Sequence, residues 1–248
     1  SDGCSGIIVK FVELSDSRLA VIGSGSLIQV LNVGGDSVVV ESIVKLPFFS
    51  TYDVLLASDG KLYMATDGDG LWRVDTDLSE KSEFEHILSY GEQPKELNKI
   101  YTMMQSADND IWLGTQMGGV FRLSLDREKG VNYSTDFGLE NMVVSDFLEL
   151  PNGDLFIATD GQGVYILDNK FQVKKKIPLT SNNILRADWN MRGNIWLSTW
   201  GDGIIEMDPN TFKTKNLDFE NSEFARPTCV FSVTELNNGE VYLCTAGV

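Results

Sequence analysis

Histidine is the side chain most often used for proton transfer near neutral pH, and this chain of 248 residues contains one, His86. A Ser–His or Cys–His nucleophile pair needs its base within hydrogen-bond reach. His86 lies in "SEFEHILSY", which we expect to form an outer strand remote from any shared site. The sequence therefore disfavours catalysis by a histidine-activated nucleophile, and no catalytic residue is predicted.

Carboxylates are the other candidates for chemistry. Asp67 and Asp69 in "TDGDG" lie two residues apart, but the loop lacks the further oxygen ligands that Ca²⁺ needs. Carboxylate-only catalysis, as in glycoside hydrolysis, stays open, although no pair stands out. Cys4, Cys229 and Cys244 lack metal-ligand spacing and are too few for a disulfide framework. We therefore expect neither a metal nor another cofactor.

A sixteen-residue pattern, "GNIWLSTWGDGIIEMD" at residues 193–208, recurs along the chain. Its other copies, the first degenerate and the last truncated, lie at 17–31, 60–75, 109–124, 153–168 and 239–248. The anchoring residues of the six copies are Gly23, Thr66, Thr115, Thr159, Thr199 and Thr245. They are 40 to 49 residues apart, about 44 on average, and a regular period of this length is typical of repeat architectures.

The side chains within each copy indicate a buried strand followed by a glycine-rich turn and a second strand. An aromatic residue stands three positions before the threonine and a small residue one position before it, as in Trp196 and Ser198. Residues two apart share one face of a strand. The other face carries aliphatic residues such as Ile195 and Leu197. A strand that is apolar on both faces must lie between neighbouring sheets.

Two further strands surround each copy, so one repeat is a four-stranded antiparallel meander with the size of a β-propeller blade. The predicted fold is all-β, a single propeller domain over residues 1–248 with five full blades and part of a sixth. Because the sixth blade lacks its outer strands, we expect a fragment of a larger, seven-bladed propeller. The predicted blades span residues 7–44, 51–88, 100–134, 143–177, 184–217 and, incompletely, 229–248.

The charge balance restricts the partners. The chain has 20 Lys and Arg against 36 Asp and Glu, a net charge of −16, which repels phosphate backbones and anionic lipid headgroups. No stretch approaches the roughly 20 apolar residues of a membrane-spanning helix. The sequence therefore predicts no nucleic-acid partner and no direct membrane contact in this segment.

The motif resembles the two-component regulator propeller repeat, here as "DIWLGTQMGGVFRL", "NIWLSTWGDGIIEMD", "LYMATDGDGLWRVD" and "LFIATDGQGVYILD". The resemblance covers nearly the whole chain and is weakest in residues 1–45. Such repeats build the extracytoplasmic sensor region of hybrid two-component histidine kinases, notably those of gut Bacteroides that respond to glycans. Related repeats also occur in propeller enzymes such as streptogramin lyases, which use histidine.

The resemblance implies a non-enzymatic, periplasmic sensor propeller that responds to oligosaccharides or another small polar ligand. It also implies a second propeller or a second protomer as a partner, with the kinase beyond the C-terminus. Two alternatives stay open: a propeller enzyme, either a lyase or a carboxylate-based glycoside hydrolase, and a protein-interaction platform.

Two groups of residues are candidates for ligand contacts. The first lies in the turns between the second and third strands, where Trp200 has no evident folding role: Asp67, Asp69, Gln116, Asp160, Gln162, Trp200, Asp202 and, in an adjoining loop, Arg226. Aromatic rings with carboxylates, amides and guanidinium groups suit carbohydrate recognition. The second group is a polar column on the first strands that we expect to line a central channel: Lys10, Asp53, Thr102, Asp146, Arg186 and Ser232.

Overall fold

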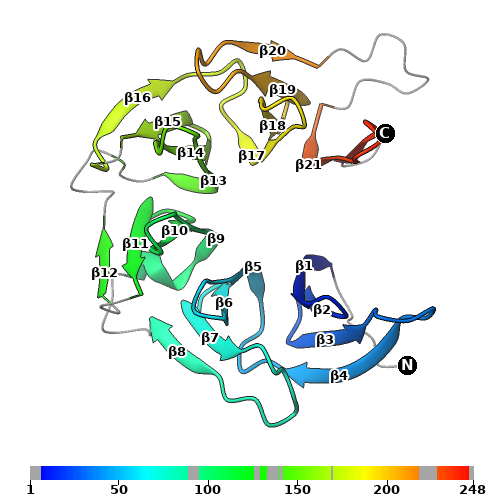
Figure 1. Cartoon of the computed structure of the whole chain (residues 1–248). Coiled ribbons are helices and arrows are strands. Elements are labelled where there is room, and N and C mark those ends of the chain that lie inside the picture. Colours follow the sequence, from blue (N-terminus) through cyan, green and yellow to red (C-terminus); the bar gives the residue numbers. More distant parts are fainter. Residues whose placement is uncertain are drawn as a thin grey trace. The chain divides into compact units, whose positions relative to one another are not determined.

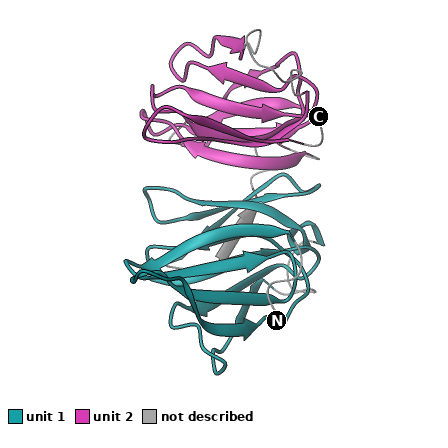
Figure 2. Cartoon of the chain, turned by 90° about the vertical axis from the view of Figure 1, so that its right-hand side faces the viewer, with its two compact units in different colours: residues 1–132 teal, residues 133–248 magenta. Residues whose placement is uncertain are grey.

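The computed structural model describes residues 7–88, 95–125, 129–132, 139, 142–168, 170–217 and 228–245. All strand pairs in these ranges are antiparallel, and the single helical element described is a 3-10 turn, Lys95–Asn98. The predicted all-β fold is therefore confirmed. The chain forms two compact units, unit 1 (Ser1–Asn132) and unit 2 (Tyr133–Val248), which Figure 2 colours separately.

Unit 1 contains three four-stranded sheets whose strands follow chain order (Figure 1). The first consists of β1 (Ile8–Ser15), β2 (Arg18–Gly23), β3 (Leu27–Asn32) and β4 (Val39–Lys45). The second consists of β5 (Thr51–Leu56), β6 (Lys61–Thr66), β7 (Leu71–Asp75) and β8 (Glu85–Leu88). The third consists of β9 (Ile100–Gln105), β10 (Ile111–Thr115), β11 (Val120–Ser124) and β12 (Lys129–Asn132).

Unit 2 contains two four-stranded sheets and one two-stranded sheet among its described residues. The first consists of β13 (Val143–Glu149), β14 (Leu155–Asp160), β15 (Gly163–Leu167) and β16 (Val173–Ile177). The second consists of β17 (Ile184–Trp189), β18 (Ile195–Thr199), β19 (Ile204–Met207) and β20 (Thr214–Asn216). The last pairs β21 (Val230–Glu235) with β22 (Val241–Thr245).

The repeated motif forms the second and third strands of a sheet, as predicted. The first strands of successive sheets contact one another within each unit: β1 with β5 and β5 with β9 in unit 1, β13 with β17 and β17 with β21 in unit 2. A meander whose first strand packs against the first strand of the next meander is the blade arrangement of a propeller.

The two faces of the second strand pack against different neighbours. Leu62 and Met64 of β6 lie in a cluster with the preceding sheet, whereas Tyr63 and Ala65 lie in a cluster with the following sheet. In unit 2, Phe156 of β14 likewise packs toward the following sheet. The aromatic knob beside a small residue is therefore the inter-sheet packing surface that the sequence indicated.

Each first strand carries a bulge one residue before the polar column. In β5, for example, Thr51 pairs with Thr66 and Asp53 pairs with Ala65, so that Tyr52 is the extra residue. A bulge turns a side chain away from the regular pleat. The six bulge residues are Val9, Tyr52, Tyr101, Ser145, Leu185 and Phe231.

Candidate ligand-binding face

The repeated threonine closes the turn between the second and third strands. The Thr66 hydroxyl donates to the Gly70 carbonyl (2.9 Å) and accepts from the Asp69 backbone N–H (3.0 Å). A hydroxyl suits this place because it donates and accepts at once. Equivalent pairs of hydrogen bonds recur at Thr115, Thr159 and Thr199.

The glycines of these turns are bound to the segment that begins the next sheet. The Asn98 carbonyl, just before β9, accepts the N–H groups of Gly68 (2.8 Å) and Gly70 (3.1 Å), which have φ of 104° and 68°. The carbonyls of Asn182 and Thr228 hold the two turns of unit 2 in the same way. The Thr-x-Gly-x-Gly pattern thus holds each turn by hydrogen bonds to the segment that begins the next sheet.

In unit 1 this arrangement places side chains on one face. Asp67, the residue after Thr66, forms an isolated backbone bridge with Lys99, and the Lys99 carbonyl accepts the Gln116 N–H (3.1 Å). We call these turns, with the segments that precede the first strands, the turn face of each unit. Asp67 and Lys99 are exposed on this backbone, and Gln116 is half-buried.

In unit 2 the same ladder runs through Asp160, Asn183 and Trp200. Asp160 bridges with Asn183, whose carbonyl accepts the Trp200 N–H (3.0 Å), and the Ser181 hydroxyl donates to the Trp200 carbonyl (3.0 Å). The Trp200 side chain is 55% exposed. It meets the Phe231 ring edge-on at a centroid distance of 6.3 Å. Two exposed aromatic rings therefore stand on a backbone that is hydrogen-bonded to Asn183, and the backbone of Asn183 in turn bridges with Asp160.

Two of the predicted turn residues are occupied by structural contacts. The Asp69 carboxylate accepts the Trp72 indole N–H (3.2 Å), and its carbonyl lies 2.8 Å from His86 Nε2. The Gln162 amide oxygen accepts the Tyr165 hydroxyl (2.9 Å). The Asp202 N–H donates to the Thr199 hydroxyl (3.1 Å), and Arg226 lies outside the described residues.

His86 lies on the outer strand β8, stacked on Trp72 at a centroid distance of 4.2 Å. Its ring nitrogen is bound to a backbone carbonyl of the neighbouring turn. The ring of His86 packs on Trp72, and its Nε2 contacts the carbonyl of Asp69. Neither of these two contacts involves a nucleophilic side chain.

The polar column occupies the predicted positions on the first strands, but two of its carboxylates link successive sheets. Asp53 is 5% exposed and accepts Lys10 Nζ (2.6 Å), the Val54 N–H (2.8 Å) and the N–H of Met103 in the next sheet (2.8 Å). The buried Thr102 is the column residue that precedes Met103 on β9. In unit 1 the column thus includes an inter-sheet tie, and its channel-lining role stays a prediction.

Asp146 repeats this tie in unit 2. Its carboxylate accepts the N–H groups of Phe147 (2.9 Å) and of Ala187 in the next sheet (3.1 Å). Burial raises the pKa of Asp146 to about 6, against the opposing effect of the Arg186 charge and of these two N–H groups. Ser232, the last column residue, pairs with Cys244 across β21 and β22.

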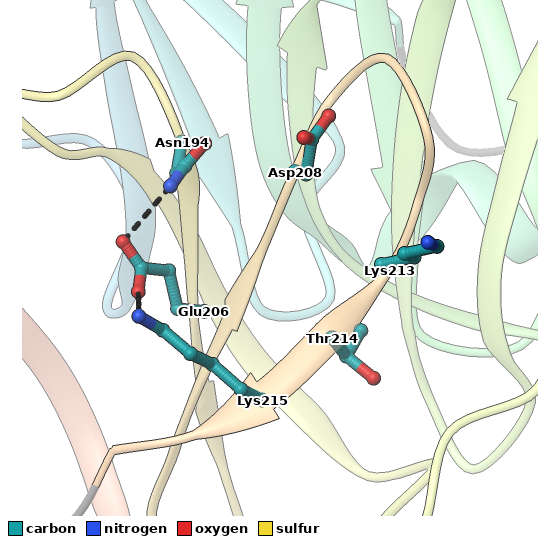
Figure 3. A pocket seen from close by; sticks show the side chains of 6 residues that line it. All are labelled: Asn194, Glu206, Asp208, Lys213, Thr214 and Lys215. Atoms are coloured by element: carbon teal, nitrogen blue, oxygen red, sulfur yellow. Dashed lines mark hydrogen bonds and ion pairs between the residues drawn. The ribbon is translucent and has the colours of Figure 1, made fainter.

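A cavity of about 190 Å³ lies at the outer strands of unit 2 and was not predicted from the sequence. Its lining residues are Asn194, Glu206, Asp208, Lys213, Thr214 and Lys215. Figure 3 shows Asn194 and Lys215 converging on Glu206, at 3.0 Å and 2.7 Å. Arg192 contacts the same carboxylate at 3.1 Å. Since the buried carboxylate is surrounded by its own donors, this cluster stabilises the sheet.

The Glu206 cluster predicts a specific acid sensitivity. Burial alone would raise the pKa of Glu206, but hydrogen bonds from Asn194, Lys215 and Asn190 and the Arg192 charge lower it to about 2. A depressed carboxyl pKa stabilises the fold above the pKa of the unfolded chain, and this contribution is lost as the pH falls toward 2. We expect the free energy of unfolding to fall less between pH 6 and pH 3 in Glu206→Gln than in the wild type.

Denaturant unfolding at several pH values measures this difference. Glu240→Gln, which removes an exposed carboxyl in the turn between β21 and β22, serves as the control and should follow the wild type. Identical pH dependence in Glu206→Gln and the wild type would contradict the assignment.

Neither a metal centre nor a membrane span emerges from these residues. Within the described ranges, no group of three or more His, Cys, Asp or Glu side chains could hold a metal ion. Over the same ranges, none of the helical structure is long and apolar enough to cross a membrane.

The ligand-competent residues that sequence reasoning missed are at the bulges. Phe231 lies beside Trp200, and Tyr52 stacks on Tyr101 with a centroid distance of 4.7 Å. The signal for them was an aromatic residue directly before the polar column. Strict alternation assigns that residue to the packed face of the strand, so the sequence pattern does not indicate its exposure.

Comparison with known proteins supports the fold. The chain is similar to the extracellular domain of a putative hybrid two-component system from B. thetaiotaomicron, with 18% identity and a TM-score of 0.74, over 97% of this chain and 33% of that one. A putative one-component system of the same organism gives 18% identity and a TM-score of 0.74, over 96% and 32%. The chain thus spans about a third of the length of these domains.

Virginiamycin B lyase from Staphylococcus aureus is also similar, with 13% identity and a TM-score of 0.68, over 96% of this chain and 84% of the lyase. No protein-family model matches the sequence, and no curated protein matches it. At these identities the likeness concerns the fold. The propeller fold and the resemblance to the extracellular domains of Bacteroides two-component systems are confirmed at that level.

Proposed function

We propose that this chain is a ligand-recognition propeller of an extracytoplasmic sensor and that it binds oligosaccharide at the turn face of unit 2. The observation that carries the proposal is Trp200, whose indole is 55% exposed on a turn that is fixed by backbone hydrogen bonds. A rigid exposed aromatic ring stacks on the apolar face of a sugar at little entropic cost.

Polar groups beside the indole suit the hydroxyls of a sugar. Asp160 and Asn183 are exposed and lie next to Trp200 in the ladder of the turn face. A carboxylate accepts hydrogen bonds and an amide both donates and accepts, which matches the hydroxyl pattern of a pyranose. Phe231 adds a second apolar surface at the edge of the indole.

A sensor role is supported better than catalysis. Asp69 accepts a hydrogen bond from Trp72, and Asp67 is paired with Lys99 (3.1 Å). Both carboxylates of this turn therefore have structural partners, which favours recognition over acid–base chemistry at this turn. The likeness to extracellular domains of two-component systems fits a periplasmic location, with a membrane-bound hybrid kinase as the output.

Signalling would then follow from a change in how propellers or protomers pack against one another when the sugar binds. A sugar that binds one arrangement of propellers or protomers more tightly than another shifts their equilibrium, and the shift passes toward the membrane. The partner in this scheme is a second propeller or a second protomer. A pure protein-interaction role would leave the turn face without affinity for sugars.

Trp200→Ala is expected to weaken oligosaccharide binding by about 1–3 kcal/mol, because an aromatic anchor of the interface is removed. The free energy of unfolding should fall by about 1 kcal/mol or less, since the edge contact with Phe231 is the one aromatic packing contact described for this ring. Calorimetric titration against host and plant glycans measures the binding.

Trp189→Ala provides the matched control, because Trp189 is 38% exposed at the opposite end of β17 in the same sheet. It should leave affinity unchanged. Equal affinity in Trp200→Ala and the wild type, or unfolding of Trp200→Ala, would rule out the proposed contact.

A further inference from the structure

We propose that unit 1 carries a second sugar-binding subsite, formed by the stacked rings of Tyr52 and Tyr101 with the ion pair of Asp67 and Lys99 at their edge. The choice of a sugar rests on the proposed function. The residues themselves lie entirely in unit 1 and include none of the neighbours of Trp200.

The first observation is the position of the two tyrosines. Tyr52 and Tyr101 are the bulge residues of β5 and β9, and their rings stack with centroids 4.7 Å apart and planes 29° from parallel. A bulge directs a side chain out of the regular pleat, and bulges are frequent at sheet edges and next to active sites. The same device in β21 places Phe231 beside Trp200.

Both tyrosine rings are half-buried rather than enclosed by the core. An aromatic pair that served only to fill space between sheets would be buried like Tyr63, which has no exposed surface. Among the described residues the Tyr101 hydroxyl makes no hydrogen bond, so it faces solvent or a ligand. Both tyrosines of the stack therefore keep part of their surface open to the outside of unit 1.

The second observation is the charge pair at the edge of the stack. Lys99 Nζ lies 3.1 Å from Asp67 Oδ1, and the side chains are 49% and 32% exposed. Burial raises the pKa of Tyr52 to about 12, and the hydrogen bond of Tyr52 with Asp67 and the negative charge of Asp67 add to this effect. The Tyr52 phenol is therefore neutral at physiological pH.

These groups define the chemistry of the ligand. The tyrosine pair offers an apolar surface for a pyranose ring. The carboxylate accepts from one hydroxyl while the ammonium donates to its neighbour, so vicinal hydroxyls fit the pair. Because Asp67 and Lys99 already balance each other, a neutral sugar is favoured over a uronate.

The test is calorimetric titration with cellohexaose, xylohexaose and maltohexaose, and with trigalacturonate as the acidic comparison. Tyr101→Ala should weaken binding of a neutral hexaose about tenfold or more, the loss of one aromatic anchor. Val9→Ala, at the bulge of β1 in the same unit, is the matched control and should bind as the wild type does.

The outcomes separate the two sites. Loss of affinity in Tyr101→Ala supports the subsite in unit 1, whether or not Trp200→Ala also loses affinity. Unchanged affinity in Trp200→Ala would count against the proposed site in unit 2 and not against this subsite. Loss in Trp200→Ala alone overturns the subsite and leaves the proposed function standing. Absence of binding of all three neutral hexaoses to the wild type, or tighter binding of trigalacturonate, also overturns it.

A measurement on the wild type keeps the proposal testable if Tyr101→Ala unfolds. N-acetylimidazole acetylates accessible tyrosine hydroxyls, and peptide mass spectrometry locates the product. A saturating neutral hexaose should slow acetylation of Tyr101, both in the wild type and in Trp200→Ala. Unchanged acetylation of Tyr101 in the presence of the sugar would overturn the proposal.

Discussion

Gly163→Ala is expected to lower the free energy of unfolding by about 2–5 kcal/mol, because the new methyl group meets backbone atoms in a left-handed conformation. Gly163 has φ of 80°, and a Cβ there would lie 2.5 Å from the Ile177 carbonyl oxygen and 3.4 Å from Pro178 Cα. The turn cannot move away, since Asn182 and Thr159 hold it.

Gly153→Ala isolates the steric part of this effect. Gly153 lies in the same sheet with φ of 79°, but nothing stands within 4 Å of a Cβ at this position. Its cost should be that of the left-handed conformation alone, about 1–2 kcal/mol. Denaturant unfolding of both variants gives the comparison. Equal destabilisation would show that the turn is not fixed against the neighbouring segment.

Asp53→Ala is expected to lower the free energy of unfolding by about 3–5 kcal/mol, the usual result of removing one partner from a buried charged network. The Asp53 carboxylate is the acceptor for Lys10 and for the backbone N–H groups of Val54 and Met103. Without it, two buried donors and an ammonium group lose their acceptor, and the tie between β5 and β9 is broken.

Asp75→Ala is the control for Asp53→Ala. Asp75 pairs with Lys61 at 2.7 Å, close to the 2.6 Å of Lys10 and Asp53, but its side chain is 71% exposed against 7% for Asp53. An exposed ion pair contributes about 0–1 kcal/mol, so Asp75→Ala should change the free energy of unfolding very little. If both substitutions lower the free energy of unfolding by the same amount, Asp53 does not link the two sheets, and its predicted channel-lining role is favoured.

The repeat made the fold predictable from sequence. A threonine and two glycines at a regular period require the same turn each time, and the aromatic and small residues before the threonine require a sheet on each side. The structure adds the reason for the threonine, whose hydroxyl closes the turn through Gly70 and Asp69. The exposure of Trp200 followed from its place in the same turn.

The partners of the site residues could not be predicted, because they depend on which side chains stand at the variable positions of each repeat and on local backbone irregularities. Asp69 and Gln162 occupy the same turn position, yet one binds an indole N–H and the other a tyrosine hydroxyl. The stacking of Tyr52 on Tyr101 depends on two bulges, and a bulge leaves no mark in an alternating pattern. The Glu206 cluster likewise joins residues from a hairpin and two strands.

Amide hydrogen exchange, with and without a saturating oligosaccharide that binds the wild type, tests the claim of a sugar-binding turn face most directly. We expect slower exchange in unit 2 at residues 199–203 and 228–231, which contain Trp200, the Thr228 carbonyl that holds its turn, and Phe231, with little change on the outer strands β16 and β20. Protection confined to the outer strands, with the Trp200 turn exchanging at its original rate, would contradict it.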